Sequence, residues 1–62
     1  MARTIYYLVD DGGVYNVISS EDFDSKGRYI NNPSYTIEDF EIIGRYHHFD
    51  AACKDCDRMN NQ

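Results

Sequence analysis

Two short stretches rich in apolar side chains open the chain and predict a β-hairpin. Residues 4–9 (TIYYLV) and 14–18 (VYNVI) contain mostly β-branched and aromatic side chains, which favour strands. Residues 10–13 between them are Asp-Asp-Gly-Gly, and an Asp-Gly pair is typical of a tight type I′ turn. The chain therefore begins with two strands that pair antiparallel.

Neither face of this hairpin is polar. If Asp11 and Gly12 are the central turn residues, Val9 faces Val14 on one side, while rings and aliphatic side chains fill the other side (Tyr6, Leu8, Tyr15 and Val17). A hairpin with one face in water would alternate apolar and polar residues. We therefore expect both faces to be covered, one by a helix of the same chain and the other by a second subunit or a partner.

The middle of the chain, residues 20–34, is polar and predicts a long, partly irregular loop. Ser20 can begin one helical turn, and the only large apolar side chains are Phe23, Tyr29 and Ile30. Loops of this kind often carry binding residues.

The C-terminal third predicts a strand followed by a helix. Residues 36–40 suit a short turn, residues 41–47 suit a strand, and Asp50 suits the N-cap of a helix that runs to about Asn60. An apolar stripe along that helix includes both cysteines (Phe49, Ala52, Cys53, Cys56 and Met59).

These elements predict a single α+β domain over residues 1–62. Its antiparallel sheet has three to four strands, including the N-terminal hairpin, and the C-terminal helix packs on one face. The predicted core combines one hairpin face, one residue of the third strand and the helix stripe. Its members are Ile5, Val9, Val14, Ile18, Ile42, Ala52, Cys53, Cys56 and Met59.

The small size of the chain favours association with another copy. A domain of 62 residues buries only about 60% of the surface that its unfolded chain exposes. Six tyrosines also exceed what so small a core can bury. Since tyrosine is common at protein interfaces, we expect a homodimer and a partner protein.

The charge pattern argues against several ligands. The net charge is −5, and the six basic residues are scattered, whereas binding to a phosphate backbone needs a basic face. The longest apolar run near the N-terminus, residues 5–9, is too short for a membrane span or a signal peptide. We therefore expect a cytoplasmic protein with no nucleic-acid or membrane partner.

The stretch HHFDAACKDC, residues 47–56, holds the only concentration of reactive groups. A zinc site would use His47, Cys53 and Cys56, but a structural site needs a fourth ligand, which would have to come from Asp50, from a distant residue or from another chain. A redox pair is disfavoured by the surrounding aspartates, which raise thiol pKa values. Reduced cysteines that face the core explain the pattern most simply.

No pattern in the chain is typical of an enzyme or a cofactor site. No serine, cysteine or threonine is placed against a histidine as in a nucleophile–base pair, and residues 10–13 lack the lysine and following helix of a phosphate-binding loop. We expect a non-enzymatic protein without a cofactor.

Residues 39–52, DFEIIGRYHHFDAA, form a strand that leads through Phe-Asp into an alanine-bearing helix. This ending resembles that of small accessory proteins encoded by bacteriophages. The resemblance covers about the last third of the chain and implies a protein that binds and blocks a host or defence protein in the host cytoplasm. It assigns no site residues.

The favoured hypothesis is therefore a small protein-binding module that inhibits by steric occupancy. Tyrosines of the uncovered sheet face would supply apolar contact, and an acidic loop would set orientation and association rate. The interface candidates are Tyr6, Tyr15, Glu21, Asp22, Asp24 and Tyr29. Two alternatives remain open: a homodimer that binds a small ligand or nucleotide between Tyr and Arg side chains, and a zinc-stabilised module.

Overall fold

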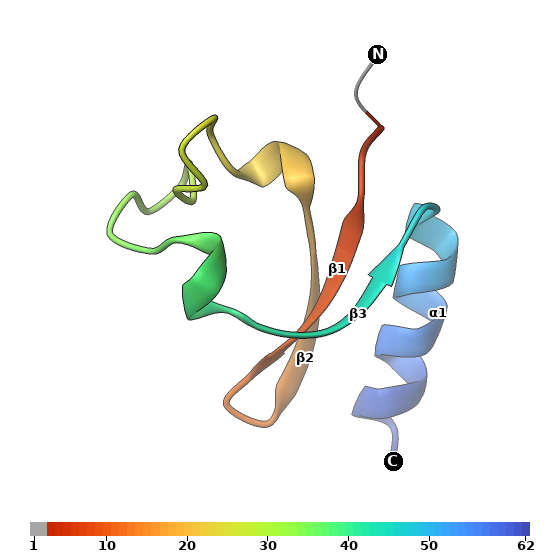
Figure 1. Ribbon diagram of the computed structural model, residues 1–62. Coiled ribbons are helices and arrows are strands. Elements are labelled where there is room, and N and C mark those ends of the chain that lie inside the picture. The colour runs from red at the N-terminus through yellow and green to blue at the C-terminus, as the bar shows by residue number, and fades with distance from the viewer. Residues whose placement is uncertain (1–2) are drawn as a thin grey trace.

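The computed structural model describes residues 3–62, which form a three-stranded antiparallel sheet with a single helix on one face (Figure 1). The strand order is β2-β1-β3, so β1 is central. The α+β prediction is confirmed. The elements in chain order are β1 (Tyr6–Asp11), β2 (Val14–Ser19), the 3-10 turns η1 (Ser20–Asp22) and η2 (Ile37–Asp39), β3 (Glu41–Tyr46) and α1 (Phe49–Asn60).

The hairpin turns at Gly12 and Gly13 rather than at Asp11 and Gly12. Both glycines have positive φ, +65° and +95°, which a type I′ turn requires at its two central residues and which glycine adopts without strain. The Asp10 carboxylate accepts the N–H of Gly13 at 2.9 Å and fixes the turn. Val9 consequently pairs with Asn16, so the expected pairing with Val14 is wrong by two residues. Because the shift is even, each side chain keeps its predicted face.

β3 pairs with β1 through a bulge. Tyr6 pairs with Tyr46, but the register shifts between Leu8 and Val9, and Val9 pairs with Ile42. The extra residue bends this edge strand, a common way to protect a sheet edge.

A glycine in β3 allows a tyrosine ring to reach the helix. A Cβ atom at Gly44 would lie 2.9 Å from the ring of Tyr46. The ring lies across this gap, and its hydroxyl donates to the Asp55 carboxylate of α1 at 2.8 Å. Gly44 and Tyr46 together link the edge of the sheet to the helix.

The helix covers the face of the sheet that carries Tyr6 and Leu8, not the predicted face with Val9 and Val14. Tyr6 packs edge-on against Phe49, with ring centroids 5.5 Å apart. Leu8 is 2% exposed and Val14 is 56% exposed. Both hairpin faces are apolar, so the alternation of residues could not show which face the helix covers. In the structure, Asp55 and Asn60 beside the helix stripe form hydrogen bonds to Tyr46 and Tyr15 of the sheet.

The buried residues come from β1 and the helix: Tyr7, Leu8, Val9, Ala52 and Cys56. Val9, Ala52 and Cys56 were predicted, and Val14 was wrongly included. Helix α1 begins at Phe49 with His48 as its N-cap, and Asp50 lies in the first turn instead of capping it. Its negative charge still stabilises this end of the helix.

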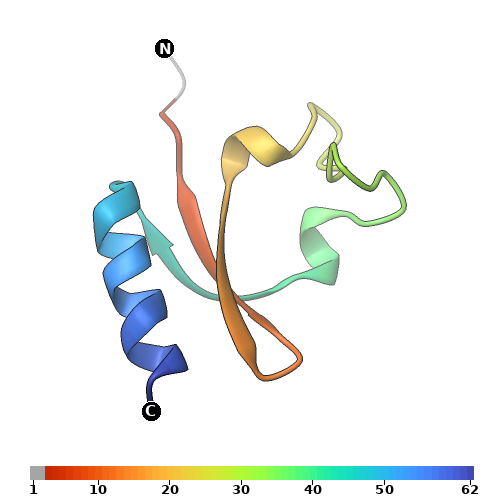
Figure 2. The same ribbon diagram turned by 180° about the vertical axis from the view of Figure 1, so that it is seen from behind.

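The middle segment of the chain lies on the opposite side of the sheet from α1, as the two views in Figures 1 and 2 show. Phe40 is the centre of an aromatic cluster there, with ring centroids 5.7 Å from Phe23, 5.3 Å from Tyr29 and 6.3 Å from Tyr35. The molecule is flat, with extents of 34 × 29 × 15 Å. This leaves part of the second sheet face open.

Candidate functional site

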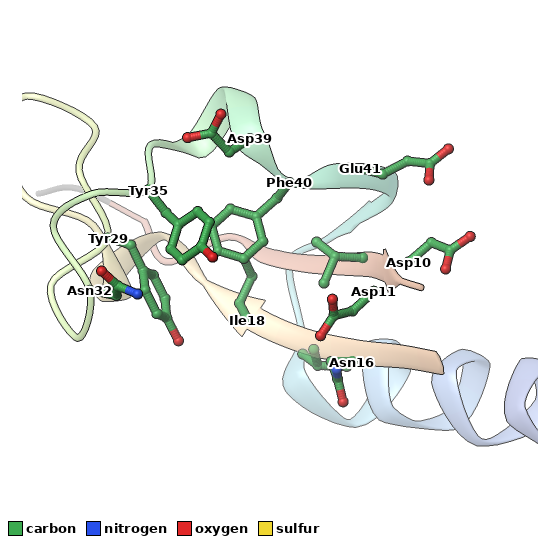
Figure 3. Close-up of a pocket in the computed structure, with 12 residues that line it drawn as sticks. Asp10, Asp11, Asn16, Ile18, Tyr29, Asn32, Tyr35, Asp39, Phe40 and Glu41 are labelled. Carbon is green, nitrogen blue, oxygen red and sulfur yellow. The ribbon is translucent and has the colours of Figure 1, made fainter. Parts of the chain in front are cut away.

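A groove of about 520 Å³ lies on the sheet face opposite the helix (Figure 3). Ile18 of the hairpin and the ring of Phe40 form its apolar centre, and Val9, which also lines the groove, is only 2% exposed. Tyr29, Asn32 and Tyr35 line one end, and carboxylates line the other. The groove therefore has an aromatic end and an acidic end, joined by an apolar centre.

The aromatic end is built by short-range hydrogen bonds in the middle segment. The Tyr29 N–H donates to the carbonyl of Tyr35 at 2.8 Å, and the Ile37 N–H donates to the carbonyl of Gly27 at 2.9 Å. An isolated bridge also pairs Phe23 with Tyr29. These bonds fold the segment into a compact loop and bring its rings together.

The acidic end is formed by the tip of β1 and the start of β3. Asp10 pairs with Glu41 across the strands, and Asp11 is the next residue of β1. In Figure 3 the Asp11 carboxylate points toward the groove, whereas Asp10 and Glu41 point outward from its rim. Asp11 and Glu41 are both exposed. Neither side chain has a hydrogen bond or salt bridge to any other described residue, 3–62.

Asp39, the fourth acid at the groove, has a structural task. Its carboxylate accepts the backbone N–H of Thr36 at 2.8 Å and closes a capping box around η2. Among residues 3–62, four acidic residues and no basic residue thus line the groove. A ligand that combines a cation with an apolar group would match this lining.

The structure brings one of the interface candidates, Tyr29, to the groove. Tyr6 and Tyr15 were expected on an uncovered face, and this placement is wrong because α1 packs on their face. Tyr6 contacts Phe49, and the backbone of Tyr15 is bonded to Asn60 in the last turn of the helix.

The acidic loop proposed to orient a partner consists mainly of turn-forming carboxylates. Asp22 accepts the N–H of Ser19 at 2.8 Å, and Asp24 accepts the N–H groups of Lys26 and Arg28, both at 2.9 Å. The bond from the Arg28 backbone is the main reason that the pKa of Asp24 lies below its usual value. Among these three acids, only Glu21 has no such side-chain bond to the described residues.

The cysteines do not form a metal site with the histidines. Among residues 3–62, no three His, Cys, Asp or Glu side chains are grouped so that they could hold a metal ion. The buried Cys56 thiol donates to the carbonyl of Tyr15 at 3.1 Å, and burial raises the pKa of this thiol. Cys53 is half-buried, both cysteines are free, and His47 is exposed. Cys56 therefore packs between the helix and β2.

Among the groove residues that the sequence interpretation missed are Asp11, Tyr35 and Phe40. Asp11 had been assigned to the turn, where its side chain would have had no particular direction. Tyr35 precedes the predicted turn and Phe40 is its last residue, and two rings so close together in a polar stretch indicate a local cluster.

Comparison with known proteins gives no relative for this chain: no protein-family model matches it, and neither does any curated protein or solved structure. The resemblance to bacteriophage accessory proteins therefore stays a prediction. Within the described residues, the structure has no helix of the length and apolar character needed to cross a membrane.

Proposed function

We propose that this protein is a small non-enzymatic binding module that acts by occupying a surface of another protein through its groove. The observation that carries the proposal is the groove itself, in which the exposed ring of Tyr35 and the Asp11 carboxylate, which has no partner among residues 3–62, lie beside an apolar centre. Such a mixture is typical of interfaces, where aromatic anchors supply contact area and charges select the partner. Inhibition by occupancy is also what the resemblance to bacteriophage proteins implies.

The charge of the groove favours a protein partner over a nucleotide. Nucleotides are anions, whereas every charged side chain that lines the groove is acidic. Among residues 3–62, no arginine lines the groove, so the groove does not by itself supply the Tyr and Arg side chains expected around a nucleotide. The molecule is also flat, and the groove lies on the sheet face opposite the helix, where a folded partner can approach.

The test is affinity capture with a matched pair of variants. Tyr35 lines the groove and is 50% exposed, while Ile30 lies outside the lining and is 57% exposed. Immobilised wild type, Tyr35→Ala and Ile30→Ala are incubated with a bacterial lysate, and bound proteins are quantified by mass spectrometry. We expect a partner that wild type and Ile30→Ala retain equally and that Tyr35→Ala loses.

Circular dichroism of the three proteins checks that the variants fold alike. A retained partner that binds Tyr35→Ala as well as wild type would place the contact elsewhere and refute the groove as the binding site. Absence of any protein retained in a variant-dependent way would refute the proposed function.

A further inference from the structure

An exposed ring and a carboxylate lie next to each other at the aromatic end of the groove. The Asp39 carboxylate accepts the N–H of Thr36 at 2.8 Å, and Thr36 directly follows Tyr35 in the chain. This bond holds the carboxylate beside the backbone of Tyr35, and both side chains lie at the same end of the groove in Figure 3. Tyr35 is 50% exposed and Asp39 is also exposed, so a ligand can reach both groups.

Both groups keep binding capacity that the described chain does not use. The hydrogen bonds of Asp39 to Thr36 end on its Oδ2 atom, and its Oδ1 atom has no hydrogen bond to residues 3–62. The Tyr35 ring lies 6.3 Å from the ring of Phe40, between centroids, and the rest of its surface is open. Arg28 pairs with Thr36 through the backbone, but it does not line the groove and forms no salt bridge with Asp39.

The remainder of the lining favours a cation, and the ring favours one kind of cation. Asp10, Asp11 and Glu41 line the same groove, and among residues 3–62 no basic side chain does, so a cation would meet attraction and no like charge there. A guanidinium can stack its plane on an aromatic face while its edge donates to a carboxylate. An ammonium is more strongly hydrated and has no plane to stack.

We infer that the aromatic end of the groove takes an arginine side chain of the partner protein, with the guanidinium against the Tyr35 ring and an N–H donated to Oδ1 of Asp39. This inference rests on the proposed function, which makes the ligand a protein, and it names the side chain that this protein presents. Charge complementarity selects the occupant, because a second copy of this chain, with net charge −5, would bring mainly like charge.

The experiment compares three capped tripeptides, Gly-X-Gly, in which X is arginine, citrulline or lysine. Citrulline keeps the planar end group of arginine without its charge, and lysine keeps the charge without the plane. Titration of each into nitrogen-15-labelled protein gives the affinity and maps the site by amide shifts. We expect the arginine peptide to bind more tightly than either by roughly 2- to 5-fold, the value of one exposed cation–π contact or ion pair, with shifts centred on Tyr35, Thr36 and Asp39.

Two variants test the two contacts separately. Tyr35→Leu removes the ring and should abolish the preference for arginine over lysine. Asp39→Asn removes the charge, keeps an oxygen that can accept the Thr36 N–H, and should lower the preference for arginine over citrulline. Glu38→Gln makes the same change of net charge at an adjacent exposed acid outside the groove lining, and should keep both preferences. The amide spectra show whether each variant keeps the fold.

The same peptides connect the inference to the captured partner. In excess, the arginine peptide should release that partner from immobilised wild type more readily than the citrulline peptide does. The preference for arginine over citrulline should also fall as salt concentration rises, since exposed charge interactions are screened.

Several outcomes would overturn the inference. Equal affinity of the arginine and citrulline peptides would exclude recognition of the charge, and equal affinity of the arginine and lysine peptides would exclude stacking. Shifts at the groove that grow with protein concentration alone would assign it to a second copy. A captured partner that depends on Tyr35, together with failure of the arginine peptide, would refute this inference and leave the proposed function standing. Preference for the arginine peptide without any captured partner would refute the proposed function and assign the groove to a small guanidinium compound.

Discussion

At the scale of single residues, Tyr46 links the sheet to the helix through one charged hydrogen bond. Its hydroxyl donates to the Asp55 carboxylate at 2.8 Å, and that bond is the main cause of the raised pKa of Tyr46. The carboxylate favours the protonated hydroxyl, because a phenolate beside it would be repelled. The ring can reach Asp55 only because Gly44 has no side chain.

Removal of this hydroxyl should therefore destabilise the fold in a pH-dependent way. Tyr46→Phe should lower the free energy of unfolding by about 0.5–1.5 kcal/mol at pH 7, the usual net value of one hydrogen bond. Since the folded state raises the pKa of Tyr46, this contribution is fully present below the unfolded pKa of about 10 and is lost as the pH rises through the folded value. The difference between wild type and Tyr46→Phe should then shrink in alkaline solution.

Urea unfolding at neutral and alkaline pH, followed by circular dichroism, measures this difference. Tyr35→Phe is the matched control, because the Tyr35 hydroxyl has no hydrogen bond to the described residues, and its stability should equal that of wild type at each pH. If the loss of stability in Tyr46→Phe stays constant with pH, ionisation of Tyr46 does not remove the contribution of this hydrogen bond, and the prediction is wrong.

At the scale of elements, the last turn of α1 covers the edge of β2 with a side-chain amide. Asn60 accepts the N–H of Tyr15 and donates to its carbonyl, both at 2.9 Å. The amide thus pairs with the strand as a neighbouring strand would. Together with the bulge in β3, this contact reduces the free backbone groups that an edge offers for unwanted pairing.

Loss of this amide should expose the edge of β2 locally. In Asn60→Ala, the two lost bonds cost about 1 kcal/mol, which the better helix propensity of alanine partly offsets. The sharper measurement is therefore hydrogen exchange at the Tyr15 amide, which should become several-fold faster. Asn61→Ala is the control, because the Asn61 side chain has no hydrogen bond to the described residues. Equal exchange in the two variants would contradict the role of Asn60.

The existence of these elements was predictable from the sequence, whereas their mutual placement was not. Local composition was enough for the hairpin, the third strand and the end of the helix. Asp-Gly and Gly-Gly both suit a type I′ turn, and only the positive φ of both glycines decides the register. Because Leu8 and Val9 are equally apolar neighbours on opposite faces, the pattern could not choose the face that α1 covers.

The candidate site depends on contacts that are distant in the sequence. Tyr29 was predicted from its position in a polar loop, but the groove needs Phe40 to fold back over the hairpin near Val9 and Asp11. Short-range hydrogen bonds and ring packing in the middle segment determine that return. No periodicity in the sequence indicates this return of the chain. The acidic residues of loop 20–34 therefore looked more suitable as binding residues than Asp11.

At the scale of the whole molecule, the acidic residues at the rim of the groove favour a basic ligand but lower the stability of the fold. Asp10 and Glu41 are paired across β1 and β3, and like charges in such a pair destabilise a sheet. The same charges make the rim of the groove attractive to a basic ligand. In a chain of 62 residues, where the margin of stability is small, this repulsion is a measurable cost of the proposed site.

Reversal of one rim charge should therefore stabilise the protein and weaken the binding of its ligand. In Glu41→Lys, a lysine opposite Asp10 replaces repulsion by attraction, which should raise the free energy of unfolding by roughly 0.2–1 kcal/mol. The new cation at the rim should also weaken retention of the captured partner if that partner is basic at the contact. Urea unfolding and affinity capture with the same variant measure both effects. Glu38→Lys changes the net charge equally at an exposed residue outside the groove lining, and it should do neither. If both variants gain equal stability, net charge rather than the Asp10–Glu41 pair is responsible. If Glu41→Lys retains the partner as well as wild type does, the rim takes no part in recognition.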